Sequence, residues 1–250
     1  MTTSPPRRRL VAPGAAAVLC LVALNTVTGC ATTVPGTANL KEPVSKPAEP
    51  TRPPTPPVTA AALPQLLIDL PNMQTLIGSP ALETGAVDTK LWELDATSHY
   101  TPPQCLSSMV YGEASTYAGL NATDAYGQTY KDPGPKGAHA VAQMIVLFPD
   151  PAAAALAAQR ITDQWRACTG RQVSETRSDG LTPPNWTIGD VVQTGAVTTM
   201  VRQPDDSKRW ACARFMAAKS NAVVDGLMCS YDIADRPVQV TDAILAKIAD

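Results

Sequence analysis

The residues with the widest range of possible chemistry in this 250-residue chain are its six cysteines. Thiols can hold a metal, exchange electrons, form disulfides or carry an acyl group, and their spacing separates these uses. The chain has no C-x-x-C pair, and no histidine stands within a few residues of a cysteine. A redox pair or a metal site is therefore disfavoured, and we expect neither a metal nor another cofactor.

The N-terminus has the layout of a secretory signal. Arginines at positions 7–9 precede an apolar run over residues 10–24, and small residues follow. We predict a signal peptide over residues 1–29, so that the chain is exported. A membrane span is the weaker alternative, because Pro13 and Gly14 interrupt the run and a span needs about twenty apolar residues.

The segment Val27-Thr28-Gly29-Cys30 resembles the lipobox of bacterial lipoproteins, although Val27 and Thr28 depart from its commonest form. In that family the cysteine thiol receives a diacylglyceryl group, and acyl chains such as palmitate together give stable anchoring. The resemblance implies lipidation at Cys30 and a place on the extracytoplasmic face of the cell membrane. The alternative is ordinary secretion with Cys30 left free, which would expose a reactive thiol.

Composition divides the exported chain into a tether and a domain. Residues 30–57 are rich in proline and poor in apolar side chains, which predicts a disordered, extended tether. The first aromatic residue is Trp92, so the core must form late in the chain, and we expect one domain over residues 58–250. The net charge of −2 provides no basic field, so we expect no nucleic-acid partner.

Export also decides how the cysteines of the domain are used. Cys105, Cys168, Cys212 and Cys229 remain after signal cleavage and lipidation, and we expect two disulfides among them. Three connectivities are possible, and the sequence alone does not choose. If residues 220–221 form a two-residue turn, Cys212 and Cys229 stand opposite each other, which leaves Cys105 for Cys168.

Helical patterns occupy both ends of the domain and its middle. Apolar spacings of three and four predict helical pieces over residues 60–77, split by Pro64 and Pro71. A helix is predicted over residues 150–170, and a last one over residues 235–249. The predicted inward face of the middle helix consists of Ala154, Ala157, Ala158, Ile161, Trp165 and Cys168.

Strand patterns fill the remainder. Pro102-Pro103 predicts an extended entry into Cys105. Predicted strands cover residues 124–130, 140–147, 185–188, 191–202, 209–218 and 222–231. This order lacks the strict alternation of a parallel doubly wound fold, so we predict an α+β domain with an antiparallel sheet.

The sequence contains no recognisable catalytic motif. The two histidines, His99 and His139, lie outside metal-ligand spacings and are interpreted as surface or loop residues. No nucleophile elbow, P-loop or dinucleotide fingerprint is present. We therefore expect no enzyme, although a dispersed triad or a pair of carboxylates could be recognised only in a structure.

Several motifs together resemble one family, the extracellular sensor domain of mycobacterial serine/threonine protein kinase H, which also occurs on lipoproteins. The resemblance covers residues 60–250 and rests on the Pro-Pro-x-Cys entry at Pro102 to Cys105, Val146-Leu147-Phe148-Pro149, Trp165-Arg166-Ala167-Cys168, Trp186 followed by Gly189, and the strands holding Cys212 and Cys229. It implies a twisted antiparallel sheet packed with helices, the two disulfides paired as above, and a cleft for an unidentified ligand. No kinase domain precedes the domain here, so we expect any signalling output to be indirect or absent.

The leading hypothesis is a lipid-anchored binding module for an unidentified ligand or protein of the cell envelope. Its ligand-binding residues are unknown, but Tyr111, Tyr117, Tyr126 and Tyr130 lie close in sequence and suit either a binding rim or the core. An envelope hydrolase with an unrecognised site and a structural scaffold with an exposed apolar patch are the alternatives.

Overall fold

The structure, a computed structural model, describes residues 56–134, 137–207 and 209–249. The predicted signal peptide, the lipidated Cys30 and the tether up to residue 55 lie outside the described residues. No helix in the described part is long and apolar enough to cross a bilayer.

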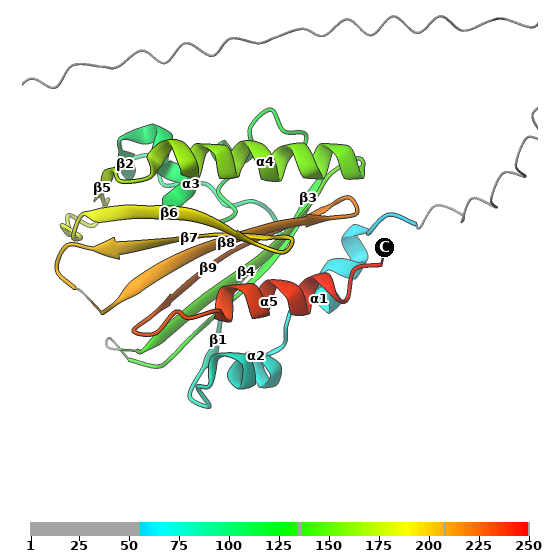
Figure 1. Cartoon of the computed structure of the whole chain (residues 1–250), viewed down its shortest axis with the longest axis horizontal. Coiled ribbons are helices and arrows are strands. Elements are labelled where there is room, and N and C mark those ends of the chain that lie inside the picture. The colour runs from blue at the N-terminus through cyan, green and yellow to red at the C-terminus, as the bar shows by residue number, and fades with distance from the viewer. Residues whose placement is uncertain (1–55, 135–136, 208, 250) are drawn as a thin grey trace, which may run out of the picture. The chain divides into compact units, whose positions relative to one another are not determined.

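Nine strands form one twisted antiparallel sheet in the order β1-β3-β4-β9-β8-β7-β6-β5-β2 (Figure 1). Their bounds are β1 Glu83–Asp88, β2 His99–Thr101, β3 Asp124–Lys131, β4 His139–Leu147, β5 Gln172–Thr176, β6 Trp186–Thr194, β7 Val197–Pro204, β8 Ala211–Lys219 and β9 Ala222–Ser230. The predicted α+β class with an antiparallel sheet is confirmed.

Helices cover both faces of this sheet (Figure 1). On one face lie α1 Leu63–Leu66, α2 Leu70–Ile77 and α5 Arg236–Leu245, preceded by the 3-10 turn η1 Ala60–Ala62. On the other face lie α3 Leu106–Met109 and α4 Pro151–Cys168, with the 3-10 turns η2 Pro103–Cys105 and η3 Ala114–Tyr117. The domain therefore has three layers, with the sheet in the middle.

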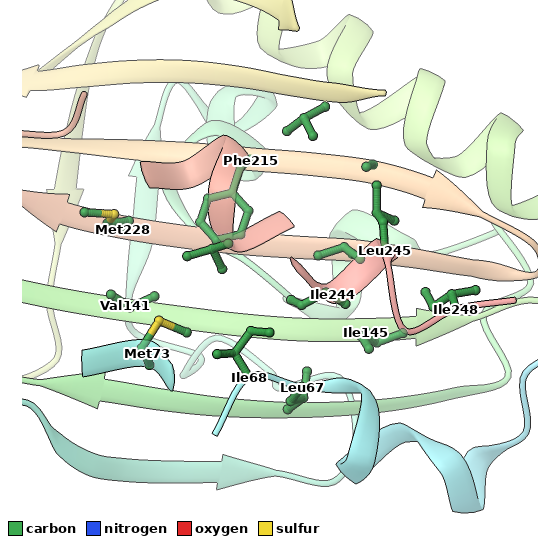
Figure 2. Close-up of a cluster of buried hydrophobic side chains, with 14 of the residues drawn as sticks. Leu67, Ile68, Met73, Val141, Ile145, Phe215, Met228, Ile244, Leu245 and Ile248 are labelled. Atoms are coloured by element: carbon green, nitrogen blue, oxygen red, sulfur yellow. The ribbon is translucent and has the colours of Figure 1, made fainter. Parts of the chain in front are cut away.

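Two apolar cores result, one on each face of the sheet. The first core, under α1, α2 and α5, includes Met73, Val141, Ile145, Phe215, Met228 and Ile244 (Figure 2). The second core, under α3 and α4, includes Met144, Val146, Phe148, Ile161, Trp165 and Met216. Because both faces are covered, the central strands are apolar at consecutive positions rather than alternately.

Local signals set the start of α4 and the end of α2 as predicted. The Asp150 side chain caps α4 by accepting a hydrogen bond from Ala153 N at 2.8 Å, and Pro151 occupies the first turn. Gly78 ends α2 in the left-handed conformation at a φ of 75°. The predicted inward face of α4 is buried, except that Ala158 is half-buried.

Four expectations about local structure were wrong. The predicted strand 191–202 contains a hairpin turn at Gly195, where φ is 58°, and the predicted break after residue 188 is a bulge inside β6. Only Pro102 is extended before Cys105, because Pro103 already starts η2. The last helix ends at Leu245 rather than at residue 249.

Strands β1, β2 and β5 were not predicted from the sequence, because they lie at or next to the sheet edges, where apolar alternation is weak.

The structure contains both expected disulfides. Cys212 and Cys229 are direct partners in the β8–β9 register, and residues 220–221 form the two-residue turn. Cys105 is bonded to Cys168 and ties η2 to the end of α4. The Cys105–Cys168 disulfide closes a loop with a sequence separation of 63 residues, and in the chain-entropy model this stabilises the fold by about 4 kcal/mol.

Candidate functional site

An apolar groove of about 370 Å³ lies on the sheet face that carries α3 and α4. It crosses β1, β3, β4 and β9, whereas α4 packs mainly on β6, β8 and β9. Its lining comprises Gly85, Ala86, Tyr111, Thr129, Tyr130, Lys131, Ala140, Val141, Ala142, Leu227 and Cys229. The groove is hollow because Gly85, Ala140 and Ala142 place little or no side chain where a larger residue would fill the space.

One wall of the groove is Tyr111, in the loop that follows α3. Its hydroxyl donates to Asp88 Oδ2 at 3.3 Å, and its carbonyl accepts a hydrogen bond from Trp92 Nε1 at 2.6 Å. The rings of Trp92 and Tyr111 meet edge to face, with centroids 6.3 Å apart. Burial and the Asp88 carboxylate raise the pKa of Tyr111 above its ordinary value, so this hydroxyl is neutral at physiological pH.

A buried ion pair holds the Tyr111 loop on the sheet. Arg214 of β8 and Asp225 of β9 meet at 2.6 Å, and their side chains are 0% and 1% exposed. The second carboxylate oxygen of Asp225 accepts hydrogen bonds from Gly112 N and from the Tyr117 hydroxyl, both at 2.8 Å. Asp225 therefore fixes the residue directly after Tyr111.

Arginines also satisfy the carbonyl end of α3. This short helix would otherwise leave its last carbonyls without partners. Arg214 Nε donates to Ser107 O at 3.1 Å, and Arg202 Nη1 donates to Ser108 O at 2.7 Å and to Met109 O. Three successive carbonyls are thus held by two side chains that come from β7 and β8.

Tryptophan rings lie against both guanidinium groups. Arg214 lies 5.1 Å from the Trp165 ring centroid, and Arg202 lies 4.9 Å from that of Trp186. Burial, with the neighbouring Arg214 charge, lowers the pKa of Arg202 to about 9. The rings and carbonyls therefore stabilise cations that burial alone would disfavour.

Comparisons with known proteins agree with this architecture. Residues 58–247 match the family model described as the PknH-like extracellular domain. The chain belongs to this family. The crystal structure of the extracellular domain of PknH from Mycobacterium tuberculosis is similar at a TM-score of 0.72 and 27% identity, covering 77% of this chain and 97% of that one. The resemblance that the sequence motifs indicated is confirmed.

Two protein kinases carry the related sequence. PknH of Mycobacterium tuberculosis (strain ATCC 25618 / H37Rv) is 27% identical over 191 residues, which are 76% of this chain and 30% of the kinase. PknJ of the same strain is 29% identical over 197 residues, covering 76% of this chain and 33% of the kinase. The chain spans about a third of the length of these kinases.

The PknH-like domain does not bring the four predicted tyrosines together. Tyr111 forms the groove wall, and Tyr130 borders the groove while its hydroxyl donates to Ile68 O in the first core. Tyr117 is buried against Asp225. Tyr126 packs against the first core on the opposite face. Only Tyr111 therefore fits the predicted rim.

The histidines of the PknH-like domain occupy different settings. His99 is exposed on the edge strand β2. His139 Nδ1 lies 2.8 Å from Asp132 Oδ2, and Ser79 Oγ donates to Asp132 Oδ1 at 2.7 Å. The carboxylate therefore stands between the hydroxyl and the imidazole, whereas in a Ser-His-Asp triad the histidine contacts the serine. No group of three or more potential metal ligands occurs in the residues that the structure describes.

Sequence reasoning missed the residues that support the groove. Arg214 and Asp225 each interrupt an otherwise apolar run in the two hairpin strands that also carry Cys212 and Cys229. An isolated charge inside a strand that is apolar on both faces is a signal for a buried pair, because charges are rarely buried without partners. That signal was available in the sequence.

Proposed function

We propose that the chain is an exported, lipid-anchored binding protein whose PknH-like domain takes up a small ligand of the cell envelope in the apolar groove. The observation that carries this proposal is the groove itself. It is concave, apolar and bordered by an aromatic side chain, as small-molecule sites commonly are. Gly112, the residue after Tyr111 in the groove wall, donates its N–H to Asp225 of a fully buried ion pair. This fixed support suits a preformed site.

The proposed location rests on the N-terminal sequence and on the family. The signal-like segment 1–29 and the lipobox-like Val27-Thr28-Gly29-Cys30 support export and anchoring, and the matched family is described as extracellular. Residues 30–57 would then space the domain at 58–250 from the membrane. The role we propose is binding without catalysis, and any signal would pass through another protein.

The anchor is tested by Cys30→Ala. We expect this variant to leave the membrane fraction and appear in the culture medium, because it removes the thiol at which acyl chains would be covalently attached. The natural chain should stay with membranes after washing in high salt. If Cys30→Ala remains membrane-bound to the same extent, the proposed anchor is wrong.

Ligand uptake is tested by native mass spectrometry. The Cys30→Ala chain, recovered from its own host without detergent or denaturant, should carry an extra mass that mild activation removes. Ala140→Leu, introduced into the same chain, should lose this mass because the larger side chain fills the groove. The matched control Ala152→Leu changes an exposed position of α4 and should keep it. A bare protein, or the same extra mass on Ala140→Leu, would contradict the proposed groove.

A further inference from the structure

We infer that the ligand of the apolar groove is a free fatty acid, with its hydrocarbon chain on the groove floor and its carboxylate at Lys131. This inference rests on the proposed function and specifies its ligand. It follows from the hydrogen-bonding capacity, the shape and the charge of the groove.

The side chains that line the groove offer little free hydrogen-bonding capacity. The hydroxyl of Tyr111 already donates to Asp88, and the hydroxyl of Thr129 donates to Ala86 O at 3.3 Å. The Tyr130 hydroxyl bonds to Ile68 O in the first core. A sugar or peptide would lose its hydrogen bonds to water here without regaining them, and that loss opposes binding. A hydrocarbon has no such loss.

The floor of the groove suits one narrow chain. It is formed by Ala140 and Ala142 of β4 beside Leu227 and Cys229 of β9, whose side chains lie on the same sheet face. The volume of about 370 Å³ is near the lower end of ligand pockets, which span roughly 300–1,000 Å³. A single acyl chain fits this size better than a lipid with two chains.

Charge selects the head group. Lys131 is the only charged residue among those described that line the groove, and it lies exposed at the end of β3. Glu83 is its partner in the β1–β3 register. Within residues 56–134, 137–207 and 209–249 the Lys131 ammonium forms no ion pair, with Glu83 or any other carboxylate, and no hydrogen bond. It is therefore free to pair with the carboxylate of a fatty acid.

The test uses the chain from Ala31 onward with its disulfides formed, so that no anchor lipid competes. This chain contains all the residues that the structure describes, 56–134, 137–207 and 209–249. Binding of octanoate, decanoate and dodecanoate is measured by titration calorimetry below the concentration at which each forms micelles. We expect affinity to rise by about two- to fourfold per added methylene, because each one buries more apolar surface.

Two variants separate the chain from the head group. Ala140→Leu should reduce dodecanoate affinity at least about tenfold, whereas its control Ala152→Leu should bind normally. Lys131→Gln should weaken dodecanoate by about two- to fivefold and leave dodecanol unchanged, and Lys90→Gln, at another exposed lysine, should change neither. The loss in Lys131→Gln should also shrink at high salt, because screening weakens the natural pair.

Several results would overturn the inference. One is the absence of a chain-length effect, and another is equal binding of dodecanoate and dodecanol to the natural chain. A third is an extra mass in the native spectrum that belongs to a molecule other than a fatty acid. In that last case the proposed function stands and only the ligand assignment fails. If the native spectrum shows no extra mass and no fatty acid binds, both the proposed function and the ligand assignment are wrong.

Discussion

The two faces of the sheet differ in the polar contacts that hold the covering segments in place. On the first face, α2 and α5 close the core, and the buried polar group Gln143 is neutral. Its amide donates to Ile68 O at 2.6 Å and accepts from Ile68 N at 2.9 Å. On the second face, the buried contact that holds the neighbouring segments is an ion pair between Arg214 and Asp225.

The difference follows from what each face must hold. On the first face, α2 and α5 bury apolar side chains that include Ile77 and Ile244, so burial positions these two helices. One amide, that of Gln143, suffices for the connection between α1 and α2. The second face holds α3, which has only four residues, and the Tyr111 loop, and neither offers much apolar area. Charged groups hold these segments through their carbonyls and N–H groups, while the adjoining part of the sheet stays uncovered as the groove.

The largest expected effect comes from breaking the ion pair on the second face. Arg214→Met leaves Asp225 buried without its cation and frees the Ser107 carbonyl, so we expect a loss of about 3–5 kcal/mol in the free energy of unfolding. Denaturant titration with the disulfides intact measures it. The double variant Arg214→Met/Asp225→Leu should recover part of the loss, because no unpaired charge remains. A loss below about 1 kcal/mol for the single variant would show that the pair does not hold the second face.

The matching change on the first face should cost less. Gln143→Leu removes the partner of Ile68 N, but Ile68 O keeps its hydrogen bond from Tyr130. We expect a loss of about 1–3 kcal/mol in the same titration and unchanged ligand binding, because the groove lies on the other face. If Gln143→Leu costs as much as Arg214→Met, the contrast between a neutral and a charged support fails.

Much of this framework could be predicted from local signals. Three features depend only on residues close together in the chain, and the sequence therefore indicates them: the cap at Asp150, the helix end at Gly78 and the Cys212–Cys229 register. The groove could not be predicted, because it depends on which part of the sheet α4 leaves uncovered. The tyrosines show the same limit, since neighbours in sequence such as Tyr126 and Tyr117 serve opposite faces.

A left-handed glycine on each face allows the two supports to be compared through the same substitution. Gly112, beside Tyr111, has a φ of 57°, and an added Cβ would lie 2.3 Å from Met144 Sδ. Gly78, at the end of α2, has a φ of 75° and open space around it. Gly78→Ala should therefore cost about 1 kcal/mol of unfolding free energy for the left-handed backbone alone. Gly112→Ala should cost about 1–2 kcal/mol and also weaken ligand binding, because the clash displaces the Tyr111 loop.

Equal stability losses and normal ligand binding in both variants would mean that the Tyr111 loop tolerates displacement. The support on the second face would then act on stability alone, and the groove would not depend on it.

The smallest expected effect concerns a carboxylate away from both arginines. Asp132 connects Ser79, just after α2, to His139 at the start of β4. Although burial acts to raise it, hydrogen bonds from Ser79 and His139 lower the pKa of the Asp132 carboxyl. A lowered pKa stabilises the fold fully above the unfolded value of about 3.9, and this contribution is lost as the pH falls through the folded value.

Asp132→Asn should therefore cost about 1 kcal/mol at neutral pH and make the unfolding free energy less dependent on pH below about 4. Thermal unfolding across an acid pH series measures both effects. The control Asp179→Asn alters an exposed carboxylate bonded to Arg177 in water and should change stability little. If the two variants behaved alike, the Asp132 link would be no stronger than a surface pair, and the edge of the first core would depend on apolar packing alone.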